Sequence, residues 1–171
     1  MSQPTVRERL ATPPVRGLGP ANAIALEATR DTATLKQLVE AASDSRAVVS
    51  IRAANALKKV QEKKPELLAP HAGKLVRCAL DCEELRTRWN LTLVVGDLPL
   101  RGRDRKLAID LMFQALTDAS GFLRTFAMQG LFNMADGDAT LKPRIRTVIE
   151  KALEDPSAAV RARARKLLPK L

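Results

Sequence analysis

The chain has 171 residues, a length that suits one domain. Hydrophobic residues make up 46% and charged residues 28%, as in a folded soluble protein, and no apolar run reaches the roughly 20 residues of a transmembrane helix. Aromatic residues are only 3%, which disfavours a β-sandwich and favours closely packed helices. The net charge of +10 is concentrated in residues 44–80, with eight basic and three acidic residues, and in residues 155–171, with five and one.

The N-terminal segment, residues 1–20, contains four prolines and no apolar stretch. This composition argues against a secretory signal and against an amphipathic helix, and it predicts a flexible arm. We therefore expect a single domain over residues 21–171 in a cytoplasmic protein. An arm held by a neighbouring copy would make a homo-oligomer, and an arm held in the chain's own groove is the alternative.

Helical periodicity then runs to the end of the chain in pairs of segments. A short helix over residues 21–29 is expected to cover the N-terminal end. First helices are predicted over residues 32–42, 65–80, 104–117 and 142–154, each followed by a second helix. Breakers at Lys63–Pro65, Gly96–Pro99 and Asp136–Asp138 separate the pairs. The predicted repeats cover approximately residues 32–62, 65–95, 101–134 and 142–171.

The second helices share a pattern that starts at four apolar anchors. The anchors are Val49, Leu85, Leu123 and Val160, at spacings of 36, 38 and 37 residues. Four residues later stand Ala53, Trp89, Ala127 and Ala164, and eight residues later stand Leu57, Leu93, Leu131 and Leu168. Positions 0, 4 and 8 lie along one stripe of a helix, so this stripe is predicted to be buried between repeats.

The segment DPSAAVRARARKLL, which begins at Asp155, resembles the HEAT repeat signature. It has an Asp-Pro turn, a Val-Arg pair that opens the second helix, an Ala four residues on and a Leu eight residues on. The second and third repeats are similar with Leu-Arg, and the first departs from the pattern because Ser50 replaces the Arg. The resemblance covers residues 32–171. It implies an all-α fold, a right-handed α-solenoid of about four HEAT-like helix pairs.

A recurrent Arg follows three anchors, and a recurrent Asp precedes them. These residues are Arg86, Arg124 and Arg161, with Asp81, Asp118 and Asp155. The resemblance implies a structural ladder of hydrogen bonds between neighbouring repeats, because a guanidinium can pair with a carboxylate in bidentate geometry. A row of phosphate-binding arginines is the alternative interpretation.

A candidate binding surface lies beside the buried stripe, since second helices line the concave face of HEAT-like solenoids. The predicted groove residues are Arg52, Asn55, Lys59, Arg88, Leu91, Phe126, Gln129, Arg163 and Lys166. Together they predict a partly basic, partly apolar groove, with an ordinary solvated face as the alternative. Trp89 is predicted to be a local core anchor, with a projecting contact as the alternative.

Catalytic and metal-binding patterns are missing from the sequence. Gly17 and Gly19 lack the Lys-Ser/Thr of a phosphate loop, and His71 is the only histidine. Cys78 and Cys82 have no second Cys/His pair with which to complete a zinc site, so they are interpreted as core residues. We expect no cofactor, no metal and no enzymatic activity. A remote alternative is an alkylpurine DNA glycosylase-like enzyme using Trp89 with Asp81 or Glu84, and a HEAT-like phycobilin lyase is more remote still.

Two hypotheses about function follow. The first is a protein-interaction scaffold or adaptor whose partly basic groove prefers an acidic protein partner. The second is nucleic-acid binding to the backbone of duplex DNA, driven by the two basic regions. The scarcity of aromatic residues argues against a platform on which single-stranded bases stack.

Overall fold

The computed structural model describes residues 4–13 and 17–171, and the regular structure in these ranges is helical. The α-helices described are α1 (Val6–Ala11), α2 (Ala21–Ala28), α3 (Thr32–Ala41), α4 (Ala47–Lys63), α5 (Ala72–Asp81), α6 (Leu85–Gly96), α7 (Gly102–Ala115), α8 (Gly121–Met134), α9 (Leu141–Ala152) and α10 (Ala158–Leu167). Two short 3-10 helices are η1 (Pro65–His71) and η2 (Leu168–Lys170). Within the described ranges, none of the helices has the length and apolar character needed to span a bilayer.

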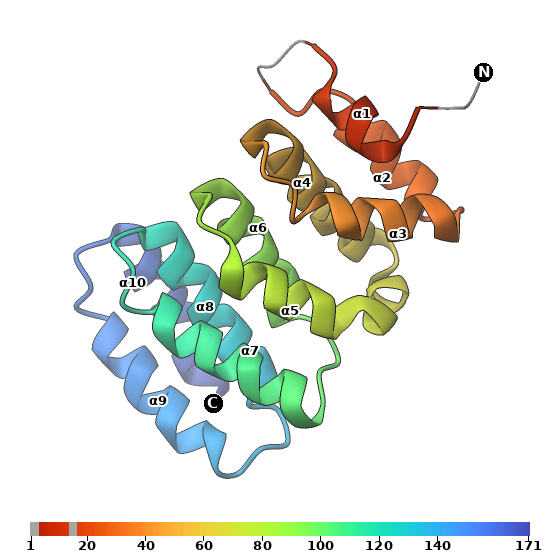
Figure 1. The fold of residues 1–171 in the computed structure, drawn as a ribbon. Coiled ribbons are helices and arrows are strands. Elements are labelled where there is room, and N and C mark those ends of the chain that lie inside the picture. Colours follow the sequence, from red (N-terminus) through yellow and green to blue (C-terminus); the bar gives the residue numbers. More distant parts are fainter. Residues whose placement is uncertain (1–3, 14–16) are drawn as a thin grey trace.

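The helices pack in sequential pairs that follow one another in chain order (Figure 1). The predicted pairs correspond to α3 with α4, α5 with α6, α7 with α8 and α9 with α10. Helix α1 packs on α3 and α4, and α2 packs on the same two helices, so they extend the stack by one unit beyond the four predicted. The short N-terminal helix expected over residues 21–29 is α2. The result is an all-α solenoid.

The second helices α2, α4, α6, α8 and α10 form a continuous row, each packed closely on the next. The first helices approach one another less closely, so the row of second helices lies on the inner, concave side of the stack. Small residues allow the closest approach: a Cβ added to Gly96 of α6 would lie 2.8 Å from the Cα of Gly130 of α8. Backbones this close leave no room for larger side chains and exclude water from the stripe.

Part of the predicted flexible arm, Val6–Ala11, is helical and packed, which corrects that prediction for this segment. Thr5 and Glu8 form a capping box, in which the Glu8 amide donates to Thr5 Oγ1 and the Thr5 amide donates to Glu8 Oε2 at 2.7 Å. Val6 and Leu10 are buried in the common core. The prolines did not prevent a short helix because they lie outside residues 6–11. Residues 1–3 and 14–16 of the predicted arm lie outside the described residues.

Arg52 of α4 holds this N-terminal segment in place. Its guanidinium is fully buried and donates to the carbonyl oxygens of Leu10 at 2.6 Å, Thr12 at 2.9 Å and Gly17 at 3.2 Å. A buried charge is tolerated when its donors are satisfied, and these carbonyls satisfy it. The prediction that Arg52 faces an open groove is therefore wrong, because the N-terminal segment covers it.

The first helix of the second repeat begins later than predicted. Pro70 lies inside the predicted helix over residues 65–80, and a proline in a helix interior lacks the amide donor and clashes with the preceding turn. The chain forms the 3-10 helix η1 up to His71 and becomes α-helical only at Ala72. The apolar residues keep a helical spacing past Pro70, so their periodicity alone did not reveal this break.

The buried stripe of α6 is shifted by two residues from the predicted anchor. Leu85 is 39% exposed, whereas Thr87 is fully buried and donates from its hydroxyl to Ser50 Oγ at 3.1 Å. Leu91 and Val95 continue this stripe, also fully buried. Thr87 therefore occupies the anchor position of the second repeat, and the prediction that Leu91 faces the groove is wrong. The Leu-Arg pair at Leu85 imitated the repeat pattern, and a polar anchor was not recognisable from sequence.

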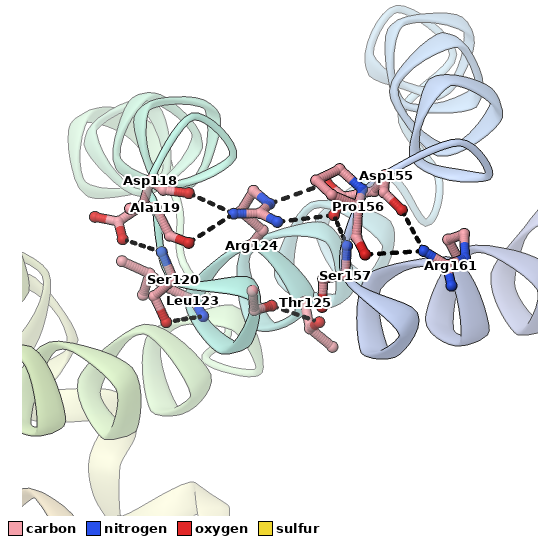
Figure 2. Close-up of polar contacts among 11 residues, drawn as sticks. Asp118, Ala119, Ser120, Leu123, Arg124, Thr125, Asp155, Pro156, Ser157 and Arg161 are labelled. Carbon is pink, nitrogen blue, oxygen red and sulfur yellow. Dashed lines mark hydrogen bonds and ion pairs between the residues drawn. The ribbon is translucent and has the colours of Figure 1, made fainter.

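The predicted ladder is present between the third and fourth repeats (Figure 2). Arg124 donates to both carboxylate oxygens of Asp155, at 3.0 and 2.7 Å, and to the carbonyl oxygens of Asp118 and Ala119, at 2.7 and 3.0 Å. The Arg124 guanidinium holds the pKa of the Asp155 carboxyl below its usual range. Arg161 repeats the carbonyl contacts with its own turn, donating to Asp155 and Pro156.

In the second repeat the ladder arginine is Arg88, which corrects two assignments. Arg88 follows the true anchor Thr87 and pairs with Asp118 at 3.3 Å, so it does not lie in the groove. Arg86, assigned to the ladder, is exposed on the concave side. Asp81, also assigned to the ladder, ends α5, and the equivalent of the ladder Asp is Cys82. The two-residue shift of α6 accounts for all three differences.

The ladder aspartates stabilise turns and are not N-caps. Asp44, Asp118 and Asp155 each accept from the amide two residues later, at 3.0, 2.8 and 2.7 Å. The residues whose amides donate these bonds are the N-caps of α4, α8 and α10, namely Arg46, Ser120 and Ser157. The Arg46 side chain also pairs with Asp44 and holds its pKa at about 2. The recurrent Asp thus sets the turns that lead into α4, α8 and α10.

We predict that Arg52→Met detaches the N-terminal helix. The substitution keeps the length of the side chain but leaves the carbonyls of Leu10 and Thr12 without their charged donor, so the free energy of unfolding should fall by about 2–3 kcal/mol. Urea denaturation measures this loss, and amide exchange should accelerate in residues 6–11 before the rest of the molecule. Uniform exchange across the chain would contradict the assigned role of Arg52.

We predict a graded response in the ladder. Arg124→Ala should lower the free energy of unfolding by about 1.5–3 kcal/mol, because a carboxylate and two carbonyls lose a charged donor. Arg88→Ala should cost less, since its contact is longer, and Arg86→Ala, the matched control outside the ladder, should cost nothing measurable. Equal effects of Arg86→Ala and Arg124→Ala in thermal unfolding would contradict this assignment.

The difference between wild type and Arg124→Ala should also depend on pH. The folded pKa of Asp155 is depressed, so the ion pair contributes fully above the unfolded carboxyl pKa of about 4. The contribution is lost as pH falls through the lower, folded pKa. Unfolding curves of the two proteins should therefore converge in acid.

Candidate functional site

The concave face carries a pocket of about 550 Å³ between the N-terminal segment, α4 and α6. Its walls are Gly17, Leu18, Val48, Ile51, Arg52, Asn55, Arg86, Trp89 and Asn90. Apolar side chains provide most of the wall, and Arg86 contributes an exposed cation. Arg52 forms part of the wall while its guanidinium holds the N-terminal segment. No carboxylate is among the described residues that line this pocket.

An aromatic pair extends the pocket toward the third repeat. The ring of Phe122, which precedes the anchor of α8, lies 5.4 Å from the ring of Trp89 at a tilt of 47°. Phe122 is 59% exposed, the most exposed of the large apolar side chains in the described residues. In a chain with so few aromatic residues, an exposed ring beside an apolar pocket is characteristic of an interaction site.

Two polar atoms at the pocket are buried without a hydrogen-bond partner in the described part of the chain. They are Oδ1 of Asn55, an acceptor, and Nε1 of Trp89, a donor. A buried polar group left unpaired costs about 1–3 kcal/mol, and folded proteins contain few of them. Both belong to side chains that line the same pocket, which distinguishes this region from the rest of the concave face.

Farther along the concave face the polar side chains are bonded to one another. Arg163 donates to Gln129 Oε1 at 2.6 Å, and Gln129 donates to Asn133 Oδ1 at 2.7 Å. Asn133 donates to Asp97, which also accepts from Gln61 at 3.0 Å. Burial raises the pKa of the Asp97 carboxyl. This chain links α10, α8, the end of α6 and α4, so these groups join neighbouring repeats.

The predicted groove residues have several different environments. Arg52 and Leu91 are buried, Arg88 belongs to the ladder, and Arg163 and Gln129 bond to each other. Asn55 lines the pocket. The remaining members, Lys59, Phe126 and Lys166, are partly or fully exposed on second helices. The groove is less basic than predicted because internal contacts engage three of its arginines.

Sequence reasoning missed the principal residues of the pocket. Arg86 was assigned to the ladder, and Val48, Ile51 and Phe122 were not identified. Trp89 was interpreted as a core anchor, with a projecting contact as the alternative; it packs against the core and also lines the pocket. In the corrected alignment, Val48, Arg86 and Phe122 directly precede their anchors, and Ile51 and Trp89 stand two residues after theirs. These two positions were recognisable only after Thr87 had been identified as the anchor of α6.

Burial opposes ionisation of the two cysteines and the histidine. Burial raises the pKa of both Cys78 and Cys82, which opposes thiolate formation, and burial lowers the pKa of His71. Within the described ranges, no group of three or more His, Cys, Asp or Glu side chains is placed to hold a metal ion.

The chain matches the sequence model of a known protein family. The family model of the HEAT repeat domain matches residues 8–171, so the match includes α2 and most of α1. No curated protein matches the chain.

We predict that Phe122→Ser exposes Trp89, the single tryptophan of the chain. Loss of the covering ring should increase quenching of Trp89 fluorescence by acrylamide, while the free energy of unfolding falls by about 1 kcal/mol. Phe113→Ser, on α7 beside Arg144, serves as the control and should leave the quenching unchanged. Unaltered quenching in Phe122→Ser would show that the aromatic pair does not shield the pocket.

Proposed function

The chain belongs to the HEAT repeat family, and from this premise we propose that it is a protein-interaction scaffold whose concave pocket binds an acidic segment of a partner protein. HEAT repeat domains are commonly interaction scaffolds and are typically non-catalytic. A cytoplasmic location and an adaptor role without catalysis are parts of this proposal. The partner's chemistry is inferred from the pocket.

The observation that carries the proposal is the composition of the pocket. Apolar walls from Leu18, Val48 and Ile51 meet the Trp89–Phe122 pair, and Arg86 is the exposed charge. Aromatic and arginine side chains are enriched among the residues that dominate the energy of protein interfaces. An apolar side chain of the partner would lie against the rings, and a carboxylate would pair with Arg86.

The unpaired atoms support the same occupant. A peptide segment offers a carbonyl and an amide at close spacing, which match the Trp89 donor and the Asn55 acceptor. Both atoms are buried in the free protein, so small side-chain movements must accompany binding. Hydrogen bonds from the peptide to these two groups would then increase the affinity and favour a peptide over a purely apolar ligand.

Duplex DNA is less well supported than a protein partner. Three of the five cations in the predicted groove, Arg52, Arg88 and Arg163, donate to groups of the chain itself. Fewer free cations on the concave face mean fewer phosphates neutralised. Self-association through the N-terminal arm also loses support, because α1 packs on α3 and α4 of its own chain.

The test is capture of partners from native lysate by wild type and by an Arg86→Glu, Phe122→Ala double variant, followed by mass spectrometry. Wild type should retain a partner that the double variant loses by at least tenfold, because charge and apolar contact are both removed. Lys106→Glu, an equal charge change on an exposed residue of α7, is the matched control and should retain the partner. Peptides from the partner should then shift Trp89 fluorescence.

Three outcomes would contradict the proposal. Equal capture by wild type and the double variant would show that the interaction does not involve the pocket. Loss of capture by Lys106→Glu alone would place it on the outer face. Salt-dependent binding of duplex DNA, with no protein partner retained, would favour the nucleic-acid alternative.

A further inference from the structure

Among the four predicted repeats, the Arg–Asp ladder is interrupted at the junction between α4 and α6. Ser50 stands where the later repeats have Arg88, Arg124 and Arg161. Cys82 stands where the other repeats have Asp44, Asp118 and Asp155, two residues before the N-cap of the second helix. Both partners of the ion pair are therefore replaced at the same junction.

The interruption leaves a pocket of about 600 Å³. The walls include Ser43, Asp44, Ser45, Ser50, Cys78 and Cys82, with Asp81, Glu83 and Glu84 from the end of α5 and the start of α6. At the junction that Arg124 and Asp155 bridge, the remaining pocket is about 240 Å³. The hydroxyls of Ser50 and Thr87 bond to each other at the buried side of the larger pocket.

At the junction between α8 and α10, Arg124 shows which groups a ladder guanidinium contacts. Arg124 donates to the backbone carbonyls of Asp118 and Ala119 and to a carboxylate of the following repeat. At the interrupted junction the equivalent carbonyls belong to Asp44 and Ser45, whose residues line the pocket. The missing carboxylate has substitutes in Asp81 and Glu83, which have no ion pair in the described part of the chain.

Two cations also line this pocket, Lys74 and Arg77, and each pairs with a carboxylate outside it. Lys74 pairs with Glu40 at 3.7 Å, and Arg77 pairs with Asp104 at 3.4 Å. The pocket therefore combines carbonyl acceptors on one wall with carboxylates on the other, an arrangement that suits a planar group with several donors. It lies at the turns between helices, separate from the concave pocket around Trp89.

We propose that this pocket binds an arginine side chain of a partner protein, which takes the place of the ladder arginine that the chain lacks at residue 50. The guanidinium donates to the Asp44 and Ser45 carbonyls and to the carboxylates at the end of α5. The arginine completes the ladder between the first and second predicted repeats and so joins them in the complex. A lysine ammonium cannot match this fork geometry.

The test uses protection of the Cys82 thiol, which lines the pocket and is partly exposed. A Cys78→Ser background isolates this thiol. N-acetyl-arginine amide should slow its alkylation several-fold in the millimolar range, while the lysine and citrulline analogues at equal ionic strength should have little effect. The Arg86→Glu, Phe122→Ala variant of the concave pocket should be protected as well as wild type, which keeps this inference separate from the proposed function.

Ser50→Arg supplies the guanidinium from within the chain. This variant should have a melting temperature higher by roughly 2–4 °C, slower alkylation of Cys82 without ligand, and no further protection by N-acetyl-arginine amide. Should it fail to fold, Asp81→Asn provides the second measurement and should weaken protection several-fold. Equal protection by the arginine and lysine analogues would overturn the proposal, as would full protection by arginine in the Ser50→Arg or Asp81→Asn variant.

Discussion

The close packing of each second helix on the next is the constraint on which the rest of this structure depends. A single helix pair cannot bury its apolar stripe alone, so stability comes from stacking. The approach of Gly96 to Gly130 shows how near the helix backbones come. Any polar residue at that interface must find its partner within the stack, because water is excluded.

This requirement explains the internal polar contacts. Thr87 is tolerated at an anchor position because Ser50 Oγ accepts a hydrogen bond from its hydroxyl, and Arg52 is tolerated in the core because backbone carbonyls accept from its guanidinium. The ladder of Arg88 and Arg124 joins successive turns by the same principle, and so does the chain from Arg163 to Asp97. Several arginines that were predicted to lie on a binding face therefore join neighbouring repeats instead.

The two proposed sites are places where this internal pairing is incomplete. At the concave pocket, Asn55 and Trp89 each keep a buried polar atom without a partner in the described chain, beside the exposed Arg86 and Phe122. At the α4–α6 junction, the ladder pair is absent and a larger pocket remains. Both sites can be recognised by comparing repeats, because residues at equivalent positions of the neighbouring repeats show which contacts are missing here. Under the two proposals, the chain would hold an acidic segment and an arginine-bearing segment at once.

The sequence by itself determined the helical pairs and the period near 37 residues, because local periodicity and turn chemistry carry that information. Its resemblance to the HEAT signature also implied a ladder of recurrent Arg and Asp residues, without saying which Arg pairs with which Asp. The sequence did not reveal helix α1, since a short helix depends on tertiary packing for its stability. It also misplaced the stripe of α6 by two residues, because a buried threonine resembles a surface residue until Ser50 is seen beside it. Only the tertiary structure decided that Arg52 is buried, that Arg88 bridges repeats and that Arg86 is exposed. Those three arginines have the same charge in the sequence, and their neighbours in space determine which of them can meet a partner.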